Sequence, residues 1–304
     1  MGLIVIITSL ILERAFGHLQ HLRRLDWFPQ YRSLLFSRVP DRWSSGIGGA
    51  ILMLAPVVLA ALFLQWLLDD VLWGFLELLF SIAVVTYCLG PEAFNQQVDA
   101  YLEAREAGEY SKAGRIAERL VGGPVSDDIH RQAKQVTTAV LYEGNIRIFA
   151  VLFWFLLLGP AGALLYRVAA AYAQDANQRL DVSALETPEF ESANAAVRVH
   201  ALLDWLPARL LSLTFFLSGS FDDAWRGWRR AWQAEQDLGE SSRSIVVSTG
   251  CGAMRHEVDD ASAETPSYDS YDLQWVRTAR ALVWRSLVVW LVIVALLTMA
   301  GWFV

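Results

Sequence analysis

Three long stretches of this chain contain almost no charged side chains: residues 46–68, 71–89 and 282–304. The second holds only Glu77, and the third holds only Arg285 near its start. A helix needs about 20 residues to cross about 30 Å of hydrocarbon, and each stretch reaches that length. A soluble core helix would show a polar face at 3.6-residue spacing, which these stretches lack. The sequence therefore predicts an all-α, polytopic helical membrane protein.

Composition and tryptophan placement agree with this prediction. The chain is 55% hydrophobic and only 19% charged, which lies on the membrane side of the usual range. It has 13 tryptophans, and several stand where a bilayer interface would hold them, namely Trp66, Trp73, Trp284 and Trp302. We therefore expect the lipid bilayer to be the first partner of this protein.

The amino terminus predicts a short first membrane helix over residues 1–12. It lacks a positive leading region and an Ala-x-Ala site, so it does not resemble a cleaved signal peptide. Arginines outnumber acids in residues 13–45, which assigns this loop to the cytoplasm. The amino terminus is then expected to face outward.

We divide the chain into five segments. Residues 1–90 are three membrane helices with the basic loop, and residues 91–145 are a cytoplasmic helix hairpin broken at Gly122-Gly123-Pro124. Residues 146–238 hold interrupted and interfacial helices. Residues 239–270, rich in Ser, Gly, Asp and Glu, are predicted to be a flexible linker. Residues 271–304 carry the last membrane helix.

Two apolar segments are interrupted. Residues 146–165 contain Gly159-Pro160-Ala161-Gly162, which favours a broken or re-entrant helical hairpin, with a kinked ordinary span as the alternative. Irregular backbone at membrane depth lines cavities or is buried in protein, so the break is a candidate binding place. Residues 203–217 are too short to cross comfortably, and Pro207 fits a helical first turn. We expect this run to lie half-inserted or against the helix bundle.

An aromatic pattern follows, with arginines interleaved. Its rings stand at intervals of four, three and four residues, at Phe221, Trp225, Trp228 and Trp232. Arg226, Arg229 and Arg230 lie between them. The pattern predicts an interfacial amphipathic helix with its guanidiniums toward headgroups, or else an aromatic face packed on neighbouring helices.

Most catalytic and binding motifs are missing from the sequence. There is no phosphate loop, no dinucleotide fingerprint and no Gly-x-Ser-x-Gly elbow. The net charge of -7 is spread out, which excludes nucleic-acid binding. Cys88 and Cys251 imply neither a disulfide nor a zinc site, and His18 and His21 lack a third ligand. We predict no metal site, no cofactor and no catalytic residue.

Four short motifs resemble the AmpE family of inner-membrane proteins. They are Glu13-Arg14, Leu152-Phe153-Trp154, the run of residues 203–210 (Leu-Asp-Trp-Leu-Pro-Ala-Arg-Leu) and Glu264-Thr265-Pro266. Their order and spacing cover nearly the whole chain. The resemblance implies a multi-pass inner-membrane protein that acts in β-lactamase induction and cell-wall signalling.

The wider superfamily includes the cobalamin-pathway amide synthase called CbiB or CobD. Its tyrosine-arginine pair resembles Tyr166-Arg167, but a polar run follows that pair, whereas here Ala170, Ala171 and Ala173 follow. Its acidic stretch before the Phe-Trp pair is represented by Glu143 and Asn145, with Arg147 near an expected acid. Since alanine supplies neither a ligand nor a proton, the resemblance implies a retained scaffold with depleted chemistry.

We therefore expect a non-catalytic membrane sensor or modulator. Its candidate pocket residues are Glu143, Asn145, Tyr166, Arg167, Asp204 and Arg209. The two arginines suit a small anionic or muropeptide-like ligand, although both could merely anchor at headgroups. Two alternatives stay open, a working ATP-dependent amide synthase of the cobalamin type and a scaffold that recruits a cytoplasmic protein through residues 92–145.

Overall fold

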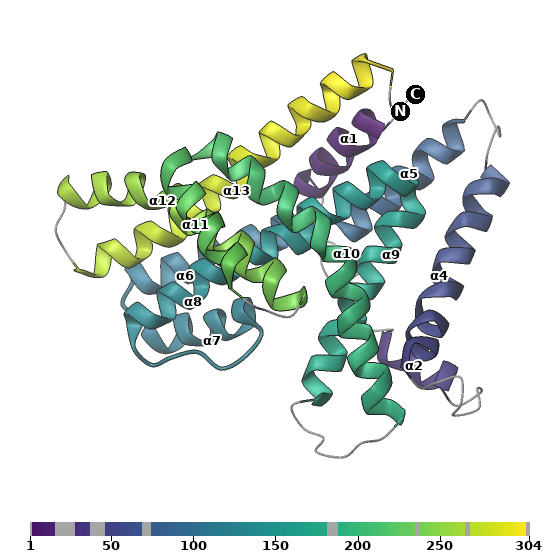
Figure 1. The fold of residues 1–304 in the computed structure, drawn as a ribbon, viewed down its shortest axis with the longest axis horizontal. Helices are drawn as coiled ribbons and strands as arrows, with labels where there is room; N and C mark the ends of the chain where they lie inside the picture. The colour runs from purple at the N-terminus through teal and green to yellow at the C-terminus, as the bar shows by residue number, and fades with distance from the viewer. Residues whose placement is uncertain are drawn as a thin grey trace. The chain divides into compact units, whose positions relative to one another are not determined.

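The computed structural model describes residues 2–15, 28–36, 46–68, 74–180, 188–234, 238–264 and 268–301. These residues form helices joined by short turns, and no strand occurs among them (Figure 1). The predicted all-α fold is confirmed. Most of the basic 13–45 loop lies outside the described residues, as do His18, His21, Asp69, Asp70, Trp73 and Trp302.

The helices follow one another along the chain with few long connections. In order they are α1 (Gly2–Ala15), α2 (Phe28–Phe36), α4 (Gly46–Leu68), α5 (Phe75–Cys88), α6 (Pro91–Glu106), α7 (Tyr110–Val121), α8 (Ile129–Gly144), a π-helical turn (Asn145–Phe149), α9 (Ala150–Leu180), α10 (Pro188–Ser218), α11 (Phe221–Gln233), α12 (Leu238–Glu264) and α13 (Tyr268–Met299).

Several helices have the length and apolarity that a bilayer requires. Among the described residues, four helical stretches qualify: Gly46–Leu68, Ile129–Asn177, Glu191–Ser218 and Leu273–Met299. Helix α5 is apolar but shorter, with 14 residues. The predicted span at Gly46–Leu68 coincides with α4. The chain is thus a multi-pass helical membrane protein.

The helices group into two compact units. The first unit comprises residues 1–90, 150–206 and 301–304, and the second comprises residues 91–149 and 207–300. In the first unit, α4 and α5 both pack on α9, and α1 packs on α5. The contact between α4 and α9 is made mainly by small and medium side chains, together with the ring of Tyr172; the others include Ala50, Met53, Ala169 and Ala176.

Helix α9 breaks at Gly159, where the sequence predicts an interruption. Gly159 has φ 68° and ψ -157°, and Pro160 follows it. A Cβ on Gly162 would lie 2.2 Å from the carbonyl oxygen of Trp154, so the chain folds back tightly over this turn. Helix resumes at once and carries Val168 and Tyr172 against α4. The predicted break is confirmed, with helix on both sides of it.

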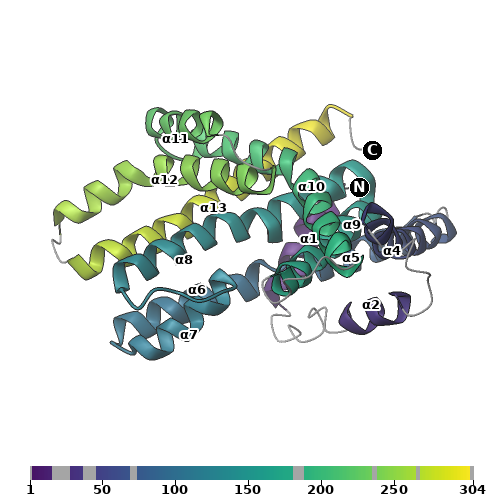
Figure 2. The same ribbon diagram turned by 60° about the horizontal axis from the view of Figure 1, so that its bottom comes forward.

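In the second unit, α8 and α12 each pack on α13, and α11 lies beside α12 (Figure 2). Helices α6 and α7 pack on each other and are joined by a turn at residues 107–109 that the sequence analysis did not predict. Helix α7 ends at Gly122, which has φ 77°, and α8 begins after Asp128. The predicted break at Gly122-Gly123-Pro124 therefore separates α7 from α8.

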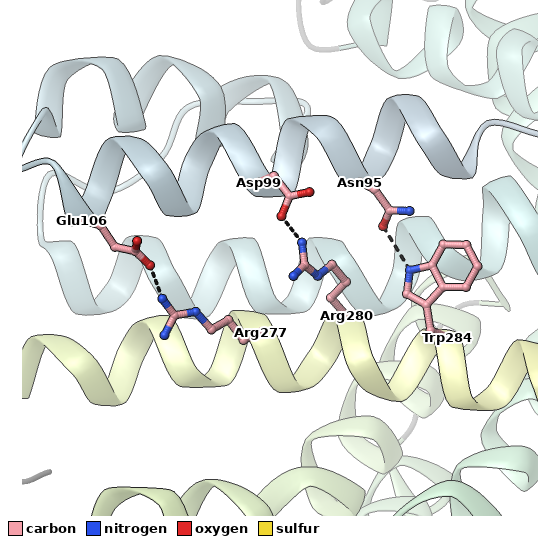
Figure 3. Close-up of polar contacts among 6 residues, drawn as sticks. All are labelled: Asn95, Asp99, Glu106, Arg277, Arg280 and Trp284. Atoms are coloured by element: carbon pink, nitrogen blue, oxygen red, sulfur yellow. Dashed lines mark hydrogen bonds and ion pairs between the residues drawn. The ribbon is translucent and has the colours of Figure 1, made fainter. Parts of the chain in front are cut away.

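A ladder of polar contacts joins α6 to α13 (Figure 3). Arg277 pairs with Glu106, and Arg280 pairs with Asp99. The indole Nε1 of Trp284 donates to Oδ1 of Asn95 at 3.2 Å. From one pair to the next, residue numbers decrease along α6 and increase along α13, so the two helices run antiparallel.

The predicted flexible linker at residues 239–270 is wrong for most of its length, because α12 occupies Leu238–Glu264. Its Ser and Gly residues form a packing face rather than a mobile chain. A Cβ on Gly252 would lie 2.2 Å from the Asp223 carbonyl oxygen, and one on Gly227 would lie 2.1 Å from the Ser248 carbonyl oxygen. Small residues here let the α11 and α12 backbones approach closely.

The prediction that residues 203–217 form a short segment is also wrong. This run is the second half of α10, and the stretch Glu191–Ser218 is long and apolar enough to cross a membrane. Pro207 lies inside the helix rather than in its first turn. The length of this helix was underestimated because its first half, before position 199, contains polar residues and was not counted with the apolar run.

Candidate functional site

A buried hydrogen bond joins two of the predicted site residues in the first unit. The hydroxyl of Tyr166 on α9 donates to Oδ1 of Asp204 on α10 at 2.8 Å. Both residues are 0% exposed. Unsatisfied polar groups are costly at this depth, so the contact holds α9 against α10.

One further polar side chain, His200, lies next to this pair. His200 stands one helical turn before Asp204, and its ring centre is 5.5 Å from that of Tyr166. Arg167 follows Tyr166 in the chain and is half-buried. A hydroxyl, a carboxyl and an imidazole thus gather in one region of the first unit.

Trp154 supplies the hydrogen-bond donor that the backbone of α10 lacks at Pro207. Proline has no N–H, so the carbonyl of Leu203, four residues earlier, loses its helical donor. The indole Nε1 of Trp154 donates to this carbonyl at 3.0 Å. The Trp154 and Pro207 motifs of the family resemblance are therefore physically linked through Leu203.

Glu143 and Asn145 lie at the junction of α8 with the π-helical turn, in the second unit. Arg147 Nε lies 2.6 Å from Glu143 Oε2, and the Arg147 guanidinium stands 5.7 Å from the Phe94 ring centre. Asn145 is 0% exposed. Single π turns inside helices are frequent at functional sites, since they insert one residue and turn its neighbours.

Arg209 connects α10 with two neighbouring helices of the second unit. Its Nη2 donates to Ser241 Oγ on α12 at 3.0 Å. Its guanidinium stands 5.7 Å from the Trp232 ring centre on α11, within cation–π range. These contacts place Arg209 against protein groups rather than at the open surface.

The candidate residues divide between the units. Tyr166, Arg167 and Asp204 belong to the first unit, and the second contains Glu143, Asn145 and Arg209. Direct contact among the candidates is shown for Tyr166 with Asp204. The single pocket that the sequence predicts stays a prediction. No three His, Cys, Asp or Glu side chains come together as metal ligands within the described part of the chain.

The sequence did not predict the roles of two residues in the Tyr166 region, His200 and Trp154. His200 carried no motif, although its spacing of four residues from Asp204 places both on one helix face. Trp154 was noted as a family motif without a role. The role of Trp154 could have been inferred from Pro207, because a proline within a continuing helix leaves one backbone carbonyl that needs another hydrogen-bond donor.

Comparison with protein families gives a match over the full length of the chain. The family model AmpE, described as a regulatory signalling modulator protein, matches residues 1–304. Protein AmpE of Shigella flexneri is 24% identical over 307 residues, which cover 99% of each chain.

Two similar proteins carry another description, cobalamin biosynthesis protein CobD. The Chromobacterium violaceum protein is 31% identical over 227 residues, or 69% of this chain and 66% of that protein. The Stutzerimonas stutzeri protein is 27% identical over 311 residues, or 98% of this chain and 97% of that protein. No solved structure matches the chain significantly.

Proposed function

The chain belongs to the AmpE family, and from that premise we propose that it is an inner-membrane sensor or modulator of β-lactamase induction and cell-wall signalling. The observation that carries the proposal is the family match, which extends over every residue of the chain. The family description as a signalling modulator favours binding and regulation over catalysis.

The residues after Tyr166-Arg167 support a role without catalysis. Where the cobalamin-type synthase has a polar run, this chain has Ala170, Ala171 and Ala173. Ala170 and Ala173 are both buried. A synthase that activates a carboxylate needs acids to position metal and phosphate, and these positions supply none.

We propose that α9 and α10 respond to a ligand at the polar group of Tyr166, His200 and Asp204, with Arg167 next to Tyr166 in the chain. The break at Gly159 interrupts α9 less than two turns before Tyr166, so the helix segment that carries Tyr166 and Arg167 begins there. Arg167 would supply positive charge here for an anionic, muropeptide-like ligand, and Arg209, which lies in the second unit, is the other arginine that the sequence predicts for such a ligand. Ligand binding would then shift how α9 packs on α10.

The test measures induction in cells. A strain with an inducible chromosomal β-lactamase and no copy of this gene receives either the wild-type chain or an Arg167→Ala/Arg209→Ala chain. We expect the double variant to change induced β-lactamase activity at an equal amount of protein in the membrane fraction. Normal induction in both the gene deletion and the double variant would overturn the proposal.

Two control variants separate charge from packing. Arg243→Ala removes an exposed arginine that stands over Tyr142 and is not one of the candidate residues, and it is expected to induce normally. Ser241→Ala removes the hydrogen bond of Arg209 but keeps its charge. If Ser241→Ala reproduces the effect of the double variant, Arg209 acts through packing rather than through a ligand.

The second candidate function is amide synthesis of the cobalamin type, favoured by the identity with two CobD proteins. Its test is an incubation of the purified chain with ATP, adenosylcobyric acid and aminopropanol phosphate. Formation of the amide product would replace the modulator proposal. We expect no product, because Ala170, Ala171 and Ala173 offer no acid or ligand.

A further inference from the structure

A cavity of about 830 Å³ lies in the second unit, among α8, α11, α12 and the start of α13. Its volume is within the range of small-molecule sites, about 300–1,000 Å³. Part of its wall is uncharged, with Ala133, Val247 and Trp275. None of the residues predicted as site candidates lines it.

Positive charge dominates the cavity wall. Its cations come from three helices and are Arg131, Lys134, Arg226, Arg230 and Arg255. Asp223 is the acid among the described lining residues, and its Oδ1 lies 3.4 Å from Nη1 of Arg226. The other four cations form no ion pair with any carboxylate that the structure describes. This concentration contrasts with the net charge of -7 for the whole chain.

Close packing of α11 on α12 directs these side chains into one space. Gly227 and Gly252 both line the cavity and both lie at the closest approach of the two backbones. Arg226 and Arg230 stand one residue before and three after Gly227, and Arg255 stands three after Gly252. Arg229, on the same helix, does not line the cavity. The arrangement is therefore selective among the arginines of α11.

Repulsion among these cations disfavours the arrangement unless an anion balances it. Arginine pairs with phosphate through two parallel hydrogen bonds, and one phosphate accommodates two or three such donors. Five cations around this volume exceed what a single phosphate would occupy. The uncharged wall offers room for a part of the ligand that is not ionic.

We propose that this cavity binds a small ligand carrying a diphosphate or two phosphate groups. The phosphates contact the arginines of α8, α11 and α12, and the remainder of the ligand lies toward Val247 and Trp275. A soluble phosphorylated molecule and a lipid headgroup share this chemistry. This proposal does not rest on the proposed role in β-lactamase induction. Ligand binding to the cavity and signalling are therefore tested in separate experiments.

The first test is thermal unfolding of the purified full chain with inorganic pyrophosphate at constant ionic strength. Ligand that binds only the folded state raises the unfolding midpoint. We expect a rise for the wild type that is lost in Arg131→Gln/Arg230→Gln. Arg229→Gln, which removes a neighbouring arginine outside the cavity, keeps the rise. An absent rise in the wild type, or an equal rise in all three proteins, overturns the proposal.

The same variants guard against a folding defect. Because removal of cations relieves repulsion, Arg131→Gln/Arg230→Gln is expected to unfold no earlier than the wild type without pyrophosphate. A lower midpoint without ligand would show that these arginines stabilise the fold by themselves, which contradicts the proposal.

The second test uses Cys251, which lines the cavity, whereas Cys88 is buried in the first unit. A small neutral maleimide labels Cys251 at alkaline pH, and occupancy slows the reaction. Protection by pyrophosphate in phosphatidylcholine nanodiscs indicates a soluble ligand. Protection in nanodiscs that contain cardiolipin, whose headgroup carries two phosphates, without pyrophosphate indicates a headgroup. No protection in either system, or equal protection in Arg131→Gln/Arg230→Gln, overturns the proposal.

Discussion

The hydroxyl of Tyr166 donates to Asp204 at 2.8 Å in a region where neither side chain reaches solvent. Tyr166→Phe removes the donor and leaves Asp204 buried with one fewer partner. We expect a loss of about 1–3 kcal/mol in unfolding free energy, measured by unfolding in detergent. Tyr110→Phe is the matched control, since Tyr110 is 52% exposed and its change is expected to cost little. Equal losses would refute this role for the pair.

The contact of Trp154 with the Leu203 carbonyl predicts a coupling with Pro207. Trp154→Phe leaves that carbonyl without a donor, and Pro207→Ala restores the N–H that a helix would supply. The double variant is therefore expected to recover part of the loss, with a coupling of about 0.5–3 kcal/mol in a double-mutant cycle. Additive effects would show that the indole acts through packing alone.

The ladder between α6 and α13 predicts small single effects and a clear charge-reversal effect. Its ion pairs are partly exposed, so Arg280→Gln is expected to cost less than about 1 kcal/mol. Asp99→Arg places like charges together and costs more, while Asp99→Arg/Arg280→Asp restores stability. Unfolding at low and high salt checks this, because salt weakens the charge effects.

Close packing of α11 on α12 predicts opposite results for two Gly→Ala changes. At Gly227 a Cβ would meet the Ser248 backbone at 2.1 Å, so Gly227→Ala is expected to cost at least about 1–3 kcal/mol. At Gly114, inside α7, the nearest atom is 3.7 Å away, and Gly114→Ala is expected to stabilise by about 0.5–1 kcal/mol. Unfolding of both variants in detergent checks the difference in sign.

Asp128 predicts a pH effect at the start of α8. The backbone N–H groups of Arg131 and His130 donate to its carboxylate and lower its pKa below the ordinary 3.8. A lowered pKa in the folded state adds stability that is present above pH 3.8 and lost as pH falls through the folded value. Asp128→Asn keeps an acceptor but is expected to flatten this acid dependence, which unfolding curves at several pH values would reveal. Asp128→Ala removes the cap at every pH.

The parts of the fold that the sequence predicted depend on strong local signals. Helix α4 has no charge over its length, and its predicted bounds match the structure. Gly159-Pro160 broke α9 as expected, because a proline ring and a left-handed glycine leave few alternatives.

The predictions that were wrong concern segments whose structure depends on partners. Helix α12 is rich in Ser and Gly, and its low intrinsic preference indicated a linker. It forms because Gly252 and Ser248 pack against the α11 backbone, a contact that no local pattern reveals. Pro207 was assigned to a helix start since its true compensation, the Trp154 indole, comes from another helix.

The candidate site was predictable in its residue types more than in its grouping. Tyr166 and Asp204 meet, although 38 residues separate them. The basic cavity was missed because its cations come from distant segments, and the arginines of α11 were assigned to headgroups. No single stretch around Arg131 or Arg255 is basic enough to indicate a site.

The backbone conformation of Gly159 restricts which codons the gene can carry at this position. Its φ of 68° with ψ of -157° belongs to a region that essentially only glycine occupies. A side chain there would strain the backbone in the middle of a membrane helix, where few contacts can adjust. In a library of all codons at this position, only the synonymous glycine codons should persist, so mutation is confined to the third base.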